Sequence, residues 1–143
     1  MTCADLRFDD IETGQKAELA WAPTMDDIDR FAALSGDYNP LHMDRAWAQA
    51  NGFADRVVHG MMLAAKVSAL VGMMLPGRRC LLLDYNLSHP NPVYAQDRVW
   101  LRGEVRDRWP DLSLIELAIR AVKDEDQSPK TVARGTVRCK ILP

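Results

Sequence analysis

The stretch GMMLAAKVSALVGMM, residues 60–74, sets the architecture of this chain. It is apolar nearly all round and carries one charge, Lys66. Such composition predicts a helix that protein covers on most sides. The stretch is shorter than the roughly 20 residues that a helix needs to cross a bilayer, so we expect a core helix and no membrane span. Leu75, Pro76 and Gly77 follow, and the Pro-Gly pair stops a helix.

The chain after this helix has the pattern of β-strands. Val99, Leu101 and Val105 alternate with polar or charged side chains, which predicts a half-buried antiparallel strand. Segments with strand character cover residues 80–87, 98–106, 112–123 and 131–141. A long antiparallel sheet that curls around the apolar helix buries both elements together.

One strand and two helices are expected before the apolar helix. Residues 16–21 alternate between apolar and polar side chains and predict the strand. Thr24 is placed to cap a helix that Gly36 ends, and Asp44 is placed to cap a second, shorter helix. Helices followed by strands are typical of an α+β fold. We expect one domain spanning residues 1–143, a length that closes one core and is too short for two ordinary domains.

The composition argues against several classes of protein. Lys and Arg number 18 against 20 Asp and Glu, and the net charge of −2 lacks the strongly basic character of a nucleic-acid-binding domain. The first ten residues have no apolar segment, so we expect no signal or transit peptide and a cytoplasmic location. Cys3, Cys80 and Cys139 show no CxxC spacing, which fits reduced thiols and predicts no metal site.

The segment SGDYNPLHMD, residues 35–44, is the candidate for chemistry. Asp37 and His42 lie five residues apart in a turn-rich segment whose backbone Pro40 restricts, so both side chains can converge on one point. A carboxylate beside an imidazole can hold and deprotonate a water molecule near neutral pH. Asn39 can position either group by hydrogen bonding, and as the residue before a proline it is not expected to be helical.

Gly60 is the second chemical element because it begins the apolar helix. At a helix N-terminus the backbone N–H groups lack intrahelical partners and the helix dipole is positive. Glycine has no side chain, so a carbonyl group can approach this backbone closely and its developing oxyanion can accept the N–H. An acid–base pair with an oxyanion donor suits chemistry beside a thioester carbonyl, and no activated Ser or Cys in a GxSxG setting is present.

At these residues the chain resembles the MaoC-like, or (R)-specific enoyl-CoA hydratase (hydratase 2), family. The resemblance covers residues 24–77, with SGDxNPLHxD at 35–44 and HGM at 59–61, and continues more weakly at Pro92-Val93 and Asp97. It implies the hot-dog fold, an antiparallel sheet wrapped around a long central helix. It also implies reversible syn addition of water to trans-2-enoyl-CoA, giving (R)-3-hydroxyacyl-CoA without a metal or other cofactor.

The resemblance implies roles for particular residues. Asp37 and His42 would be the catalytic pair, and the Gly60 N–H would be the oxyanion donor. Ser68 matches a polar residue that the family keeps near the site. For the CoA substrate that the resemblance implies, Arg78 and Arg79 are candidates for binding the phosphates, because arginine offers bidentate recognition; the alternative is a solvated surface pair.

Four further residues are open to more than one interpretation. Family members commonly carry Gly where this chain has Gln96, which bears on the geometry of that turn more than on the chemistry. Lys66 either reaches the mouth of a tunnel or lies along the helix surface. His59 is expected to fix the entry to the helix without taking part in chemistry. His89 is interpreted as a strand-end residue, with no partner identifiable from the sequence.

Two other functions remain as alternatives. A 3-hydroxyacyl-acyl carrier protein dehydratase would use the same residues in the reverse direction, and a basic rim, which would favour the carrier protein, is not evident in the sequence. A non-catalytic acyl-CoA-binding subunit is possible on a hot-dog fold, although the chemical residues are intact. A thioesterase fits the motif less well.

The expected partners are an acyl-CoA or, for the dehydratase alternative, an acyl carrier protein thioester, and a second copy of this chain. A chain of 143 residues has no second domain with which to build a deep cleft. We therefore expect a homodimer in which two sheets pair edge to edge.

Overall fold

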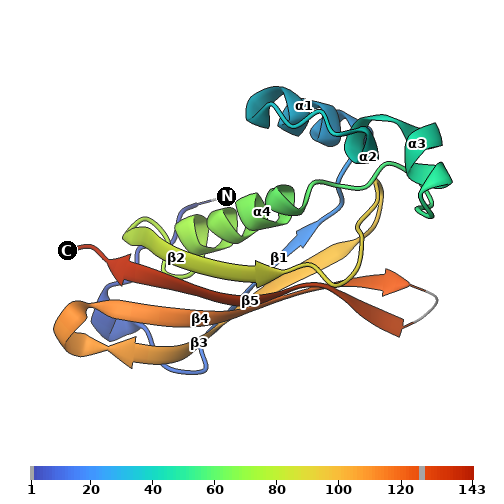
Figure 1. The fold of residues 1–143 in the computed structure, drawn as a ribbon. Helices are drawn as coiled ribbons and strands as arrows, with labels where there is room; N and C mark the ends of the chain where they lie inside the picture. The colour runs from blue at the N-terminus through green and yellow to red at the C-terminus, as the bar shows by residue number, and fades with distance from the viewer. Residues whose placement is uncertain (1, 126–127) are drawn as a thin grey trace.

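An antiparallel sheet forms one layer of the molecule, and helices form the other (Figure 1). In the computed structural model, which describes residues 2–125 and 128–143, one sheet contains five strands in the order β1-β3-β4-β5-β2. The strands are β1 (Lys16–Trp21), β2 (Cys80–Ser88), β3 (Val99–Trp109), β4 (Leu114–Glu125) and β5 (Ser128–Ile141). The predicted α+β class with an antiparallel sheet is confirmed.

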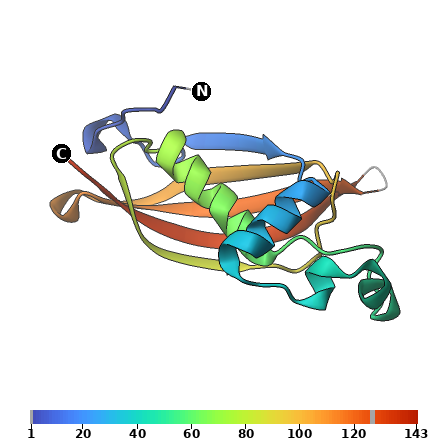
Figure 2. The ribbon, with the colours of Figure 1, turned by 90° about the horizontal axis from the view of Figure 1, so that it is seen from above.

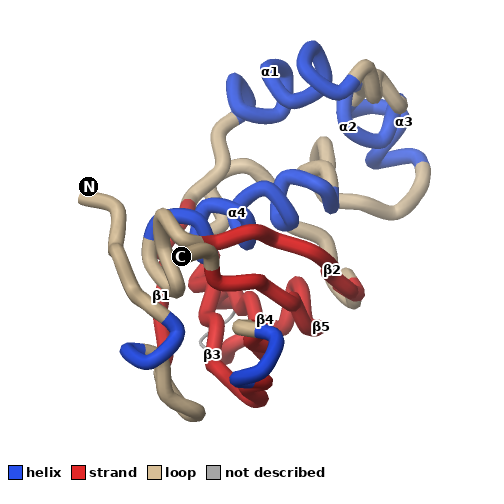
Figure 3. Tube along the Cα trace, turned by 90° about the vertical axis from the view of Figure 1, so that its left-hand side faces the viewer, coloured by secondary structure: helices blue, strands red, loops and turns tan. Residues whose placement is uncertain are grey.

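The helices divide into a long one on the sheet and a group of shorter ones above it. They are α1 (Met25–Ser35), α2 (Pro40–Met43), α3 (Arg45–Ala50) and α4 (Gly60–Met73), with 3₁₀ turns at Phe8–Asp10 and Pro110–Leu112. Figure 2 shows α4 crossing the sheet obliquely, with α1 passing over its N-terminal end. Figures 1 and 3 place the group α1–α3 on the side of α4 that faces away from the sheet. No helix among the described residues is long and apolar enough to span a membrane.

The core lies between α4 and the inner face of the sheet. Met62, Leu63, Val67, Leu70 and Val71 are the buried residues of α4, and they belong to one apolar cluster with the inward side chains of β3, β4 and β5. At Gly103 on β3, a Cβ would lie only 2.9 Å from Leu70 Cδ2, so the absence of a side chain lets the helix approach the sheet closely.

The other face of α4 is less covered than its sequence suggests. Met61, Ala65, Ser68 and Ala69 are exposed, although we expected the helix to be enclosed on most sides. One chain supplies one sheet, and a single sheet covers one face of a helix.

Local signals placed most element ends correctly. Thr24 Oγ1 accepts a hydrogen bond from Asp27 N at 3.1 Å, and Asp27 Oδ2 accepts one from Thr24 N at 2.8 Å, so α1 begins at a capping box. Strand β3, predicted to end near residue 106, continues to Trp109. A bulge between Val105 and Asp107 shifts the register there, which interrupts the alternation on which the prediction rested.

The segment around Pro40 was predicted as a turn and contains a single helical turn, α2. Proline is well tolerated at the first position of a helix, because its missing N–H would have no intrahelical partner there. Asn39 itself is not helical, with φ −53° and ψ 133°, as its position before a proline predicts.

The turn between β2 and β3 places Gln96 in the left-handed region of backbone conformation. Gln96 has a positive φ of 72°, a conformation that costs an L-residue with a side chain more than glycine. The turn is held by Gln96 N, which donates to Pro23 O at 2.7 Å, and by Asp97, which accepts from Tyr94 N at 2.8 Å. Asp97 also pairs with the buried amine of Lys123 at 2.7 Å.

We predict that Gln96→Gly stabilises the protein by about 1 kcal/mol, because it relieves the left-handed backbone conformation. Urea unfolding of both proteins measures the difference. Gln49→Gly in α3, where the backbone is helical, is the matched control and should destabilise by about 0.5–1 kcal/mol. A loss of stability in the Gln96 variant would contradict the assignment of strain to this turn.

Candidate active site

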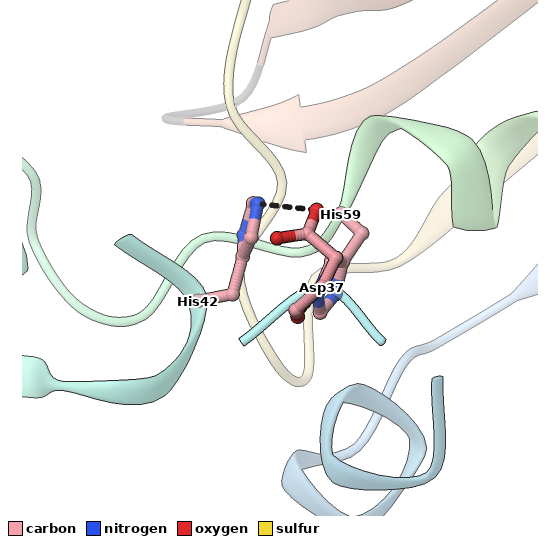
Figure 4. Close-up of side chains that lie close together, drawn as sticks. All are labelled: Asp37, His42 and His59. Carbon is pink, nitrogen blue, oxygen red and sulfur yellow. Dashed lines mark hydrogen bonds and ion pairs between the residues drawn. The ribbon is translucent and has the colours of Figure 1, made fainter. Parts of the chain in front are cut away.

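Asp37 is placed by the end of α1. Gly36 adopts φ 77° and terminates the helix, and its N–H donates to Ala32 O at 2.8 Å. The next N–H, that of Asp37, donates to Ser35 Oγ at 3.2 Å. The carboxylate is thereby directed toward α2 (Figure 4), and half of the side chain, 51%, stays exposed.

His42 is placed by α2, which Asn39 caps. The Asn39 side-chain oxygen accepts a hydrogen bond from Leu41 N at 2.9 Å, and Asn39 N donates to Asp37 Oδ1 at 3.2 Å. We expected the Asn39 amide to position Asp37 or His42 by hydrogen bonding. The structure shows it acting through the backbone of the short helix that carries His42, as a cap.

The predicted pair comes together at a distance suited to a shared water molecule. His42 Nε2 and Asp37 Oδ2 lie 3.9 Å apart, which is longer than a direct hydrogen bond (Figure 4). One water oxygen can lie about 2.8 Å from both atoms at this separation. The His42 side chain is only 13% exposed, so the pair has one buried and one accessible member.

The hydrogen bonding of His42 determines which nitrogen is free. Its Nδ1 lies 2.7 Å from Val57 O, and because a carbonyl can only accept, Nδ1 carries the proton. Nε2, the nitrogen that faces Asp37, is then an acceptor in the neutral ring. Burial lowers the pKa of His42 below its ordinary 6.5, against a smaller opposing effect of the bond to Val57. The imidazole is therefore neutral at pH 7 and able to accept a proton.

His59 has a larger positioning role than the sequence suggests. Its ring is buried, 1% exposed, and stacks on the His42 ring with centroids 3.8 Å apart. Its Nε2 donates to the backbone oxygen of Asp37 at 3.0 Å. As the N-cap residue of α4 it fixes the helix entry, as expected, and it also restrains both members of the pair.

Arg56 is a positioning residue that the sequence analysis missed. Its Nε donates to His42 O at 2.5 Å, and its terminal nitrogen forms an ion pair with Asp29 on α1. The side chain therefore ties α1 to α2. Asp29 and His42 lie 27 and 14 positions from Arg56, so no local pattern indicates the contact.

The same side chains contain three potential metal ligands, but their arrangement suits hydrogen bonding better. Donor atoms of Asp37, His42 and His59 lie within 4.8 Å of one another. The two imidazoles are stacked with only 26° between their planes, so their in-plane lone pairs run side by side and do not converge on one ion. One nitrogen of each ring is also engaged by a backbone carbonyl.

Gly60 begins α4 beside this pair, as predicted. The His59 side chain makes no capping bond, so the Gly60 N–H has no side-chain cap. Ser68 lies two turns further along α4 and lines a hollow of about 300 Å³ between α4 and β2. The lining is otherwise mostly apolar and includes Met61, Phe31 and Leu87.

The remaining candidates lie away from the pair. Arg78 and Arg79 follow the opposite end of α4, about 20 Å of helix from Gly60, and both face Asp5, with N–O distances of 3.8 Å and 2.5 Å. The Lys66 amine lies 5.2 Å from the centre of the Trp21 ring, which corresponds to the interpretation that it lies along the helix surface.

The fold and the pair define a class of protein. An antiparallel sheet around a long helix, with an acid–base pair at the helix N-terminus, is the arrangement expected of the MaoC-like family. The family model described as "MaoC like domain" matches residues 8–113, and the chain belongs to this family.

Individual relatives are similar over most of their length. The (R)-specific enoyl-CoA hydratase of Aeromonas caviae is 40% identical over 110 residues, which are 77% of this chain and 82% of the relative. The solved structure of the (R)-hydratase from A. caviae involved in PHA biosynthesis matches with a TM-score of 0.85 and 37% identity, covering 93% of this chain and 98% of that one. The R-hydratase PhaJ1 from Pseudomonas aeruginosa matches with a TM-score of 0.89 and 31% identity, covering 98% and 88%.

We predict that the lowered pKa of His42 makes folding stability pH-dependent. The unfolded chain takes up a proton near the ordinary pKa of 6.5, whereas the folded chain does so only at lower pH. Stability contributed by the neutral ring is thus present above pH 6.5 and is lost as the pH falls through and below it. Urea unfolding at pH 7.5 and pH 5 should show a smaller loss for His42→Gln than for the wild type; an equal loss would contradict the prediction.

Proposed function

We propose that this protein is an (R)-specific enoyl-CoA hydratase, which adds water reversibly to trans-2-enoyl-CoA to give (R)-3-hydroxyacyl-CoA. The observation that carries the proposal is the 3.9 Å separation of Asp37 and His42 at the N-terminus of α4. The similarity to (R)-hydratases over most of their length supports the same reaction. A cytoplasmic location and a single domain, both expected from the sequence, remain predictions.

The pair is equipped to hold one water molecule between its two members. Neutral His42 accepts a hydrogen bond at Nε2, and the Asp37 carboxylate accepts another. As the water oxygen bonds to C3 of the enoyl group, one member of the pair takes one of the two water protons and that proton passes to C2, so a single water molecule supplies both the hydroxyl group and the hydrogen. Because the water molecule is held on one face of the double bond, the hydroxyl group and the hydrogen add to the same side.

The N-terminus of α4 stabilises the charge that this addition creates. Electron density moves from the double bond to the thioester oxygen, which becomes enolate-like. The Gly60 N–H donates to this oxygen at the positive end of the helix dipole. The apolar hollow that starts at Met61, next to Gly60, is where we place the acyl chain.

We predict that Asp37→Asn and His42→Gln each lower the turnover of crotonyl-CoA by about 10²- to 10⁴-fold while the protein stays folded. Each change removes one of the two groups that hold and deprotonate the water. The loss of enoyl thioester absorbance measures the rate, and chiral analysis of the product gives its configuration. Asp26→Asn, which alters an exposed ion pair with Arg30 on α1, is the matched control and should leave the rate unchanged.

Two outcomes of that experiment would contradict the proposal. Pure wild-type protein that hydrates no enoyl-CoA across several chain lengths would reject the activity. An (S) product would reject the stereochemical assignment, which rests on the family.

We further propose that two copies of the chain pair through β2. This strand is an edge of the sheet, and it exposes Leu81, Leu83 and Tyr85, whereas exposed edges usually carry charges that prevent pairing. Exposed Met61 on α4 adds to the apolar surface on this side, since it lines the hollow between α4 and β2. A second β2 paired antiparallel would cover this surface and close the open side of that hollow.

We predict a dimer by light scattering and a shift toward monomer in Leu83→Lys, because the charge would lie in the paired edge. The monomeric variant should also lose activity, since the hollow would lose a wall. Leu112→Lys, at an exposed leucine in the turn between β3 and β4, is the matched control and should stay dimeric. A wild-type monomer with full activity would contradict the prediction.

A further inference from the structure

His89 lies against the N-terminus of α4, where no role has been assigned to it. It follows β2 directly, and a Cβ built on Gly60 would be 3.4 Å from its Cδ2 and 3.5 Å from its Nε2. The space that glycine leaves open is therefore bordered by an imidazole ring. The ring is exposed, and among the described residues neither of its nitrogens has a hydrogen-bond partner.

All three histidines of the chain gather at this helix end. The sequence contains three, and they come from α2, from the N-cap of α4 and from the segment after β2. His42 and His59 stack on each other, and the His89 ring borders the open space beside Gly60, the residue that follows His59. The first two use ring nitrogens on backbone carbonyls, which leaves His89 as the histidine with both nitrogens available for a ligand.

The distances allow one oxygen atom to contact both Gly60 and His89. A backbone nitrogen lies about 2.5 Å from the Cβ of its residue, so Gly60 N and His89 Nε2 are at most about 6 Å apart. An acceptor oxygen takes N–H bonds of about 2.9 Å, and two such bonds span this separation.

We propose that His89 donates a second hydrogen bond, from Nε2, to the thioester oxygen that the Gly60 N–H holds. The inference rests on the proposed function, because it concerns the same substrate oxygen. Two donors aimed at the enolate-like oxygen stabilise the transition state more than one, since the negative charge is greatest there. Neutral imidazole has one N–H, which either ring nitrogen can carry, so the proton can reside on Nε2. His89 is thus a catalytic residue that contacts the substrate: it donates a hydrogen bond and does not transfer its proton.

The test compares His89→Phe with His89→Gln in crotonyl-CoA hydration. Phenylalanine keeps a ring against Gly60 and removes the donor, so kcat should fall by about 10²-fold with KM little changed. Glutamine retains an N–H and should recover a substantial part of that loss. Ser88→Ala, which alters the neighbouring residue whose hydroxyl donates to Arg134 O at 3.3 Å, is the control and should keep wild-type kinetics.

A second readout does not depend on turnover. Butyryl-CoA, which has no double bond to hydrate, can be labelled with ¹³C at its carbonyl and followed by infrared difference spectroscopy. The carbonyl stretch of bound butyryl-CoA should move to lower frequency in the wild type and less so in His89→Phe.

The outcomes separate this inference from the proposed function. An inactive wild type would reject the hydratase proposal itself. An active wild type with an equally active His89→Phe variant, or with an unchanged carbonyl frequency, would overturn the role of His89 alone. Equal losses in the Phe and Gln variants, together with lower melting temperatures, would show a structural role and would also overturn it.

Discussion

Burial of one apolar face of α4 against the sheet is the constraint on which the site depends. The buried side chains of α4 and the absence of a side chain at Gly103 set the distance between the helix and β3. They thereby determine where the N-terminus of α4 lies. The proposed oxyanion donor is a backbone group at that end, so core packing determines its position and no flexible side chain does. Chemistry at this position requires that the core remain closely packed.

The acid–base pair is attached to the same helix end through His59. This one residue occupies the N-cap position of α4, donates to the backbone of Asp37 and stacks on the ring of His42. Arg56 completes the support by joining α2 to Asp29 on α1. The two proposed catalytic side chains thus come from a turn and a one-turn helix, which would be mobile alone, and the buried ring and the guanidinium restrain them.

The sequence predicted what local chemistry determines. Caps and glycines marked the helix ends, and the motif around Asp37 and His42 located a pair that the fold brings to 3.9 Å. Contacts between distant segments could not be predicted from one sequence. Arg56 bonds two elements far away along the chain, and His89 reaches Gly60 across the gap between β2 and α4. Neither contact leaves a periodic or spaced signal, because each depends on tertiary packing.

The expectation that α4 would be enclosed was wrong for a single chain. The apolar character of α4, on which that expectation rested, still favours an assembly of chains. A helix that is apolar all round is expected to be covered on all sides in the functional protein, and the functional protein can contain more than one chain. The described chain covers one face of α4. On the other face, exposed Met61 and Ala65 line the hollow between α4 and β2. Strand β2 is an edge of the sheet and exposes apolar residues too. Water against such a surface is unfavourable by roughly 25 cal/mol per Å² of apolar area. The hollow proposed for the acyl chain and the surface that a second copy would cover are then adjacent, so in the proposed dimer the association of two chains would also complete the hollow.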